Sequence, residues 1–414
     1  MTSLHELEES AGAFALSRRG HSLPASPIRK LAPLADAARA RGTKVYHLNI
    51  GQPDIETPPC MIERLKSLTA KTIEYSPSTG TPEFLRSLQR YYERHVGITL
   101  HQNQILATTG GSEAILFAFM ACADEGDEVI VVEPFYANYA TFAAMAGLKV
   151  VPVTSRGRDG FHLPPRHVWE RALTPRTRCV IVCNPNNPTG TVFSREEMEM
   201  AADFCRANSL FLISDEVYRE FVYDGQEVVS ALALPDVDQF AIVVDSLSKR
   251  YSACGIRLGA LVTRNAEVYS AALRMAEGRL SPPGLAQFMA VAAETLGDEY
   301  KTRVVAEYQR RRDVLFEGLT SIPGVFLLKP EGAFYCMARL PVKSAEDFAI
   351  YLLTEFEEEG ETVMVAPGNG FYISPLGRDE IRIAYVLHEA DLRRSVELLR
   401  IALERYRERM KDEV

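Results

Sequence analysis

The stretch Asp245–Gly259, which reads DSLSKRYSACGIRLG, gathers two serine hydroxyls, a lysine and an arginine into one short polar segment. The apolar run Ala241–Val244 directly before it predicts a buried strand. A lysine placed after such a strand can attack a carbonyl group if its amine is kept neutral. Ser246, Ser248 and Arg257 are suited to hold a phosphate group, because hydroxyls and a planar guanidinium bond its oxygens well. The alternative is a solvated basic loop, and the stretch alone leaves both interpretations open.

The composition describes a globular chain long enough for two domains. Its 414 residues are 47% hydrophobic and 24% charged, which excludes a disordered or fibrous protein. The net charge of −9 argues against a general nucleic-acid binder, because phosphate backbones require clustered positive charge. No eighteen apolar residues run together, so no membrane span is expected, and the acidic N-terminus is not a signal peptide.

The seven cysteines are an odd number scattered along the chain, and they do not suggest a disulfide framework. Cys179 and Cys183 lie in a predicted strand with no second pair nearby, so buried thiols are favoured over a zinc site. No metal is therefore expected, and a reducing, cytoplasmic location follows.

The middle of the chain alternates apolar, β-rich runs with helical patterns such as Glu113–Ala123 and Arg195–Ala207. This alternation predicts an α/β fold with a mainly parallel seven-stranded sheet flanked by helices. Ligands bind such sheets at the carboxyl ends of the strands. The predicted strands are Ile105–Thr108, Val129–Val132, Val150–Val153, Cys179–Cys183, Leu210–Ile213, Ala241–Val244 and Ala260–Thr263.

The flanking segments predict a smaller α+β domain. We expect residues 1–28 to form an N-terminal arm, residues 29–60 and 297–414 the small domain, and residues 61–296 the large domain. The predicted helices of the flanking segments are Ile28–Arg41, Asp298–Leu319 and Ala345–Glu357, with a last helix at the C-terminus. The predicted strands are Val45–Ile50, Val325–Leu328, Ala333–Arg339, Val363–Val365 and Ile381–Tyr385.

Two motifs at predicted strand ends could bind an anion or a flat ring. The segment TTGGSE at residues 108–113 joins a strand to a helix, whose free N–H groups can bind an anion, although most such turns only cap the helix. The segment EPFYANY at residues 133–139 offers an aromatic side chain that could stack on a planar ring or pack in the core.

Two further strand ends carry an asparagine and an aspartate. In CNPNNPTG, residues 183–190, two Asn-Pro pairs fix an extended turn that presents Asn187 as a rigid donor and acceptor. Asp215, in the segment DEVY at residues 215–218, follows a buried strand, where a carboxylate is costly unless it is paired. A buried cation such as a protonated ring nitrogen would pair with it, and a helix cap is the alternative.

From about Ile28 to the C-terminus the chain resembles the class I/II aminotransferases, pyridoxal 5′-phosphate enzymes of fold type I. Within that family it is most similar to bacterial aspartate aminotransferases. The motifs that carry the resemblance are Ser246-x-Ser248-Lys249, Gly255-x-Arg257-x-Gly259 and the Asn-Pro-x-Asn-Pro-Thr-Gly turn.

The resemblance implies a role for each residue of the series. Lys249 would form the Schiff base with pyridoxal phosphate and move the substrate proton, and Asp215 would pair with the protonated pyridine nitrogen. Tyr218 and Asn187 would bond the phenolic oxygen of the ring, and Tyr136 would stack on it. The implied catalytic residues are Lys249, Asp215 and Tyr218. The implied phosphate ligands are Ser246, Ser248, Arg257, the backbone of Gly111, Ser112 and Glu113, and Tyr75 from a second subunit, so a homodimer is expected.

For the substrate, the resemblance implies that Arg382 binds the α-carboxylate, helped by Asn187 and Gly51. Some members of this branch place a lysine where Ser112 stands here, to meet the distal carboxylate. Arg279 is our sequence candidate for that contact, and a surface arginine is the alternative interpretation. Aspartate as amino donor and 2-oxoglutarate as acceptor are the expected small-molecule substrates.

Three other functions share the fold. One is an aminotransferase for aromatic or neutral amino acids, and another is a fold-type-I lyase that eliminates instead of transferring. The third is a non-catalytic regulator, but such regulators carry an N-terminal DNA-binding module of about sixty residues. The 28-residue leader is too short for that module, and an intact Lys249 with Asp215 favours catalysis.

Overall fold

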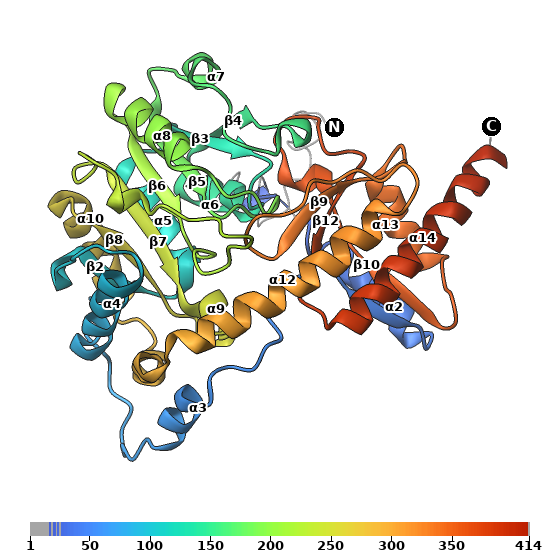
Figure 1. The fold of residues 1–414 in the computed structure, drawn as a ribbon. Coiled ribbons are helices and arrows are strands. Elements are labelled where there is room, and N and C mark those ends of the chain that lie inside the picture. The colour runs from blue at the N-terminus through green and yellow to red at the C-terminus, as the bar shows by residue number, and fades with distance from the viewer. Residues whose placement is uncertain (1–15, 18–19, 22, 25, 413–414) are drawn as a thin grey trace.

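A seven-stranded sheet forms the centre of the computed structural model, which describes residues 16–17, 20–21, 23–24 and 26–412 (Figure 1). In spatial order the strands are β2 (Ile105–Thr108), β8 (Gly259–Thr263), β7 (Ala241–Ser246), β6 (Phe211–Asp215), β5 (Thr177–Cys183), β3 (Glu128–Glu133) and β4 (Lys149–Thr154). The strands from β7 to β4 in this order are parallel to one another, and β8 runs antiparallel to both of its neighbours, β7 and β2. The predicted α/β fold with a mainly parallel sheet is thereby confirmed.

Two hydrophobic cores lie on the two faces of this sheet. Successive side chains of a strand point to opposite faces, so Ile242 and Val244 of β7 enter one core while Ala241 and Val243 enter the other. One core is closed by α5 (Gly110–Cys122), α6 (Asn138–Ala146) and α10 (Ala266–Gly278). The other is closed by α4 (Pro82–His95), α7 (Arg166–Ala172), α8 (Arg195–Ala207) and α11 (Gly284–Ala290).

Two smaller sheets are built from the flanking segments. β1 (Lys44–His47) pairs in parallel with β10 (Glu361–Met364), which joins the start of the chain to its C-terminal part. This pairing agrees with the predicted small domain, whose boundaries stay a prediction. The other sheet is antiparallel, with β11 (Ala366–Pro367), β12 (Glu380–Ala384) and β9 (Tyr335–Arg339). Around them lie α2 (Ala32–Ala40), α12 (Asp298–Thr320), α13 (Ala345–Thr354) and α14 (Glu389–Asp412), and two short helices elsewhere are α3 (Pro59–Lys66) and α9 (Leu247–Arg250).

Several predicted elements differ from the structure by a few residues at their ends, and two differ most. The helix predicted from Ile28 begins only at Ala32, because Pro33 suits the first turn of a helix and the residues before it form turns. The strand predicted at Val325–Leu328 is wrong: Phe326 makes a single bridge to Arg339. Pro323 and Pro330 flank that run, and because a proline has no backbone N–H to donate, they limit how far a strand ladder can extend there. The arm predicted at residues 1–28 lies mostly outside the described residues.

Within the described part of the chain, no helix combines the length and the apolar content needed to cross a lipid bilayer.

The sheet brings the polar motifs of the sequence to one edge. Cys183 at the end of β5 lies opposite Asp215 at the end of β6. Ser246, at the end of β7, lies opposite Gly259, which also pairs with Thr108 of β2. Because these positions are adjacent in the ladder, motifs that are far apart in the sequence meet at the carboxyl ends of the parallel strands.

A buried network of ion pairs holds the helix that carries Lys249. Asp245 accepts a hydrogen bond from Arg250 and lies 3.5 Å from Nη1 of Arg219. Nη2 of Arg219 bonds Glu216 at 2.6 Å. Burial raises the pKa of Asp245, but the two guanidinium groups outweigh it and hold that pKa at about 2. Arg250, to which the sequence assigned no role, therefore ties α9 to the end of β7.

We expect Arg250→Ala to lower the free energy of unfolding by about 3–5 kcal/mol, because it leaves the buried carboxylate of Asp245 with only the longer, 3.5 Å contact to Arg219. The matched control is Arg206→Ala, which removes a solvent-exposed pair with Asp203 and should cost at most about 0.5 kcal/mol. Urea unfolding of both variants measures the difference. Equal losses would mean that the buried pair contributes no net stability.

Candidate active site

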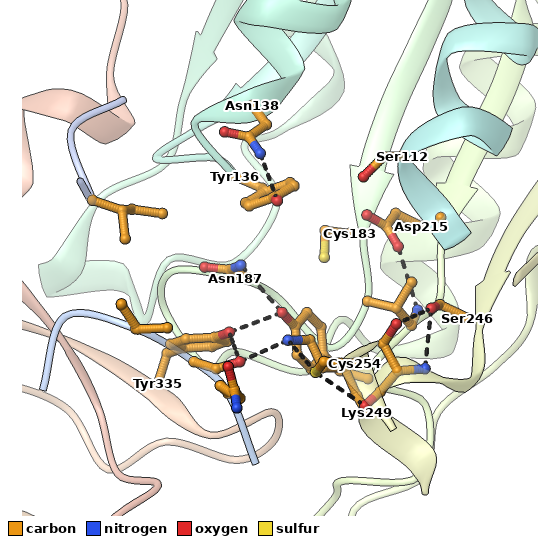
Figure 2. Close-up of a pocket in the computed structure, with 18 of the residues that line it drawn as sticks. Ser112, Tyr136, Asn138, Cys183, Asn187, Asp215, Ser246, Lys249, Cys254 and Tyr335 are labelled. Atoms are coloured by element: carbon orange, nitrogen blue, oxygen red, sulfur yellow. Dashed lines mark hydrogen bonds between the residues drawn. The ribbon is translucent and has the colours of Figure 1, made fainter. Parts of the chain in front are cut away.

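A cavity of about 580 Å³ opens at this edge of the sheet, and its wall is completed by residues near β1, β9 and β12 (Figure 2). Most of the site residues predicted from the sequence come together there. They are Gly51, Gly111, Ser112, Tyr136, Asn187, Asp215, Tyr218, Ser246, Ser248, Lys249, Arg257 and Arg382. Three predicted residues, Tyr75, Glu113 and Arg279, do not line it.

The amine of Lys249 projects into this cavity from α9. Its Nζ donates a hydrogen bond to the carbonyl oxygen of Gly51 at 2.6 Å and lies 3.7 Å from the sulfur of Cys254. Gly51 has no room for a side chain, because a Cβ there would lie 1.8 Å from the hydroxyl of Tyr335. The absence of a side chain at position 51 therefore lets the backbone carbonyl meet the lysine.

Asp215 is a buried carboxylate that has no countercharge among the described residues. It accepts hydrogen bonds from the hydroxyl of Tyr139 at 2.6 Å and from the backbone of Val217 at 3.3 Å. In the described part of the chain no basic side chain lies within ion-pairing distance of it. Burial therefore raises its pKa to about 6, although the hydrogen bond from Tyr139 acts to lower that pKa. A cation in the cavity would stabilise the ionised form.

Tyr139 is a neighbour of Asp215 that the sequence did not single out. It stands three residues after Tyr136, in the first turn of α6, and the two rings meet edge to face with their centroids 5.5 Å apart. Tyr136 itself lines the cavity, and its hydroxyl accepts a hydrogen bond from Asn138 at 2.7 Å. Of the two tyrosines of this motif, Tyr136 therefore faces the cavity and Tyr139 supports Asp215.

Asn187 connects two other groups of the site. Its amide nitrogen donates to the hydroxyl of Tyr218 at 3.3 Å, and its oxygen accepts from Nη1 of Arg382 at 3.1 Å. The hydroxyl of Tyr218 also lies 2.9 Å from that of Tyr335, a second residue that the sequence did not assign. Burial raises the pKa of Tyr218 well above its ordinary value, so its hydroxyl stays protonated and can donate.

Arg382 is a buried guanidinium that has no acidic partner among the described residues. It is 1% exposed, lies between the rings of Tyr335 and Phe371 at 4.7 and 4.8 Å, and donates to the carbonyl oxygen of Asn49. Its Nε has no hydrogen-bond partner, and burial lowers its pKa. A planar cation with free donor capacity at a cavity wall fits a carboxylate ligand.

The opposite end of the cavity is suited to an anion. Ser246 and Ser248 are buried, with their hydroxyls 3.0 Å apart, so the solvated-loop interpretation of this segment is wrong. Arg257 stands beside the start of α5, where a Cβ on Gly110 would lie 2.6 Å from its Nη2. Hydroxyls, a guanidinium and the first N–H groups of a helix, including that of Gly111, converge here as a phosphate site requires.

The three predicted residues outside the cavity have different surroundings. Tyr75 lies in the loop between α3 and α4 and is 80% exposed. Glu113 accepts a hydrogen bond from the backbone of Thr109 at 2.8 Å. Arg279 faces away from the cavity: its Nη2 donates to the carbonyl of Ala107 at 3.2 Å, and its Nε lies 3.4 Å from Glu113. Within one chain the structure does not support a substrate contact for Arg279.

Comparison with known proteins places this site in a family. The sequence profile described as aminotransferase class I and II matches residues 43–399. The chain belongs to the class I and II aminotransferases. The predicted resemblance is thereby confirmed, and with it the assignment of the chain as an enzyme of this family.

Members of the aminotransferase family that are similar to this chain carry different substrate names. The chain is 31% identical to the aspartate/prephenate aminotransferase of Thermus thermophilus, over 92% of this chain and 97% of that protein. It is 32% identical to aromatic-amino-acid aminotransferase 2 of Thermococcus litoralis, over 90% and 94% of the two chains. A solved structure of the Thermus thermophilus aspartate aminotransferase with maleate has a TM-score of 0.85 at 30% identity, over 94% of this chain and all of that one.

We expect the stability of the protein, stripped of bound small molecules, to depend on pH through Asp215. Its pKa is raised by folding from about 3.8 to about 6, so the native state binds this proton more tightly than the unfolded state. The resulting stabilisation is present below pH 4 and is lost as the pH rises to 6, at roughly 1.4 kcal/mol per pH unit. Asp215→Asn removes this titration.

Urea unfolding of the wild type and the Asp215→Asn variant between pH 4 and pH 7 measures that difference. The stability of the wild type relative to the variant should fall across the window and then level off above pH 6. A constant difference would show that the carboxylate has no raised pKa in the folded protein.

Proposed function

We propose that the cavity binds pyridoxal 5′-phosphate and that the enzyme transfers the α-amino group of an amino acid to a 2-oxo acid. Aspartate and 2-oxoglutarate are the proposed pair. The observation that carries this proposal is the pair of uncompensated buried charges, Asp215 and Arg382, in the wall of the cavity that also holds the amine of Lys249.

The residues present fit this cofactor. Its phosphate would be held at the end formed by the two serine hydroxyls, Arg257 and the start of α5. Its ring would lie against Tyr136, with the phenolic oxygen near Tyr218 and Asn187 and the ring nitrogen at Asp215. The unpaired carboxylate of Asp215 supports this fit, because a protonated ring nitrogen supplies the missing cation. Bound there, pyridoxal phosphate would supply an electron-withdrawing ring that stabilises the negative charge left on Cα when its proton departs.

The protein's own groups would bind, orient and move a proton. Arg382 and Asn187 would grip the α-carboxylate of the substrate, which fixes the direction of its Cα–H bond. Lys249 would take the proton from Cα and release it again, since its Nζ reaches the cavity and is restrained by the carbonyl of Gly51 and the sulfur of Cys254. Tyr218, kept protonated by burial, would donate a hydrogen bond to the ring oxygen.

Aromatic amino acids are the second candidate class of substrate. The relative from Thermococcus litoralis, named as an aromatic-amino-acid aminotransferase, supports that alternative. A lyase on the same fold would use the same cofactor site, so the product of the reaction has to distinguish the two chemistries.

We also propose that the enzyme works as a homodimer. Tyr75 is exposed in a region rich in exposed apolar side chains, and such surfaces support contact with another protein. Ser76 bonds the carbonyl of Pro282 at 3.0 Å, so the loop before α4 and the segment before α11 form one surface. Its exposed large apolar residues, with those of the neighbouring α3, are Ile62, Leu65, Ile73, Tyr75, Leu280 and Leu285. A cytoplasmic location is proposed as well, and the seven free cysteines support a reducing compartment.

We expect Lys249→Ala to abolish the cofactor's absorbance band for its covalent link to the protein and to lower transamination by roughly 100- to 10,000-fold or more. Lys149→Ala, at an exposed lysine of β4, is the control and should keep both. Retention of band and activity in Lys249→Ala would overturn the whole assignment.

A panel of amino donors with 2-oxoglutarate tests the substrate, and much faster turnover of phenylalanine or alanine would exclude aspartate. Formation of ammonia without a 2-oxo acid acceptor would identify a lyase.

Mixing two weakened variants tests whether Tyr75 acts across a dimer interface. We expect Tyr75→Ala and Lys249→Ala to be impaired alone and to regain activity when they are unfolded and refolded together. In the hybrid, one site combines an intact Lys249 with Tyr75 from the partner subunit. Turnover of the mixture, compared with each variant refolded alone, measures this recovery. If Tyr75 acts within its own chain, no hybrid site is complete and the mixture gains nothing.

A further inference from the structure

The cavity wall holds four cationic side chains, counted over the residues that the structure describes: Arg29, Lys249, Arg257 and Arg382. The proposed function, on which this inference rests, uses three of them for the proton transfer, the phosphate and the α-carboxylate. The fourth is left without a role. We propose that Arg29 binds the distal carboxylate of the substrate, so that the enzyme prefers dicarboxylate amino acids and 2-oxo acids.

The position of Arg29 follows from the late start of α2. Because this helix begins at Ala32, residues 26–31 form a turn at the cavity and not the flank of a helix. The turn is anchored on both sides of Arg29. The side chain of Asn49 donates to the carbonyl of Ile28 at 2.8 Å, and Lys30 pairs with Glu346 at 2.6 Å.

Asn49 connects this turn to the residue that would bind the α-carboxylate. Its side chain holds the carbonyl of Ile28, while its own backbone carbonyl accepts a hydrogen bond from Arg382. Asn49 therefore holds the backbone next to Arg29 and the guanidinium of Arg382 at fixed positions relative to each other. Two cations held in that way can bind two carboxylates of one ligand at a fixed separation.

The electrostatics of Tyr136 agree with this placement. Burial raises the pKa of Tyr136 to about 12, and the charges of Arg382 and of Arg29 both act against that rise. Both guanidinium groups are thus close enough to influence the same phenol in the cavity wall. The guanidinium of Arg29 is exposed and makes no hydrogen bond or ion pair with another described side chain, so it is available to a ligand.

The other candidates are less suitable. Arg279 is held outside the cavity by backbone carbonyls and Glu113, and Ser112 lines the cavity but is neutral. Because Arg29 is exposed, its guanidinium can remain hydrated when a neutral side chain occupies the cavity. Its effect is therefore an attraction for a second carboxylate and not a barrier against apolar substrates.

The test compares the holoenzyme of Arg29→Gln with that of Lys30→Gln, a neighbouring exposed lysine that does not line the cavity. For Arg29→Gln we expect kcat/KM for aspartate and for glutamate to fall roughly 10- to 100-fold, with values for alanine and phenylalanine within about twofold. Lys30→Gln should change none of them. Arg29→Lys, which keeps the charge, should recover much of the loss.

A binding measurement separates this inference from the proposed function. Calorimetric titration with maleate, a dicarboxylate, and propionate, a monocarboxylate, needs no turnover. Arg29→Gln should weaken maleate binding roughly 10- to 100-fold and leave propionate binding unchanged. Unchanged maleate binding, or equal losses for every donor and both acids, would overturn the role of Arg29. An enzyme that transaminates none of the donors but shows the maleate effect would overturn the proposed function alone.

Discussion

Two opposite charges are buried in the wall of one cavity and do not neutralise each other. Asp215 is held by Tyr139 at the end of β6, while Arg382 is held by Asn187 and Asn49 at the small antiparallel sheet. Burying an unpaired charge costs several kcal/mol, so a chain that keeps both apart must recover that free energy elsewhere. In the proposed function, a cofactor that brings a cation to Asp215 and a substrate that brings a carboxylate to Arg382 would provide the missing partners. The site is therefore electrostatically complete only when it is filled.

The segment after β7 shows the contrast between charges that serve the fold and charges that serve the ligand. Asp245 and Arg250 are both buried and neutralise each other below α9. Between them in sequence, Lys249 turns to the cavity, and Arg257 follows at the other end of the segment without an acidic partner in the described chain. The paired charges fix the backbone, so that the unpaired ones can remain in place without partners of their own.

Much of this arrangement could be predicted from the sequence, because buried parallel strands appear as short apolar runs and their polar ends follow directly. Local patterns do not reveal partners from other segments. The pairing of Arg250 with Asp245 and the bond from Tyr139 to Asp215 depend on side-chain directions that only the folded sheet determines. The strand expected at Val325–Leu328 is not formed, although its local pattern is that of a strand. Its apolar residues fit a strand, but its ladder is limited to one bridge.

In the proposed function, recognition of the substrate and the chemistry come from different parts of the chain. Asp215 ends β6 of the large sheet and Lys249 lies in α9, directly after β7, whereas Arg382 belongs to β12 and Arg29 to the turn before α2. A substitution in that turn can change the charge that faces the substrate without disturbing the strand ends that hold the amine and the carboxylate. In the proposed site, the strand ends would set the chemistry at the α-carbon, and a short, separately anchored segment would set the side-chain preference.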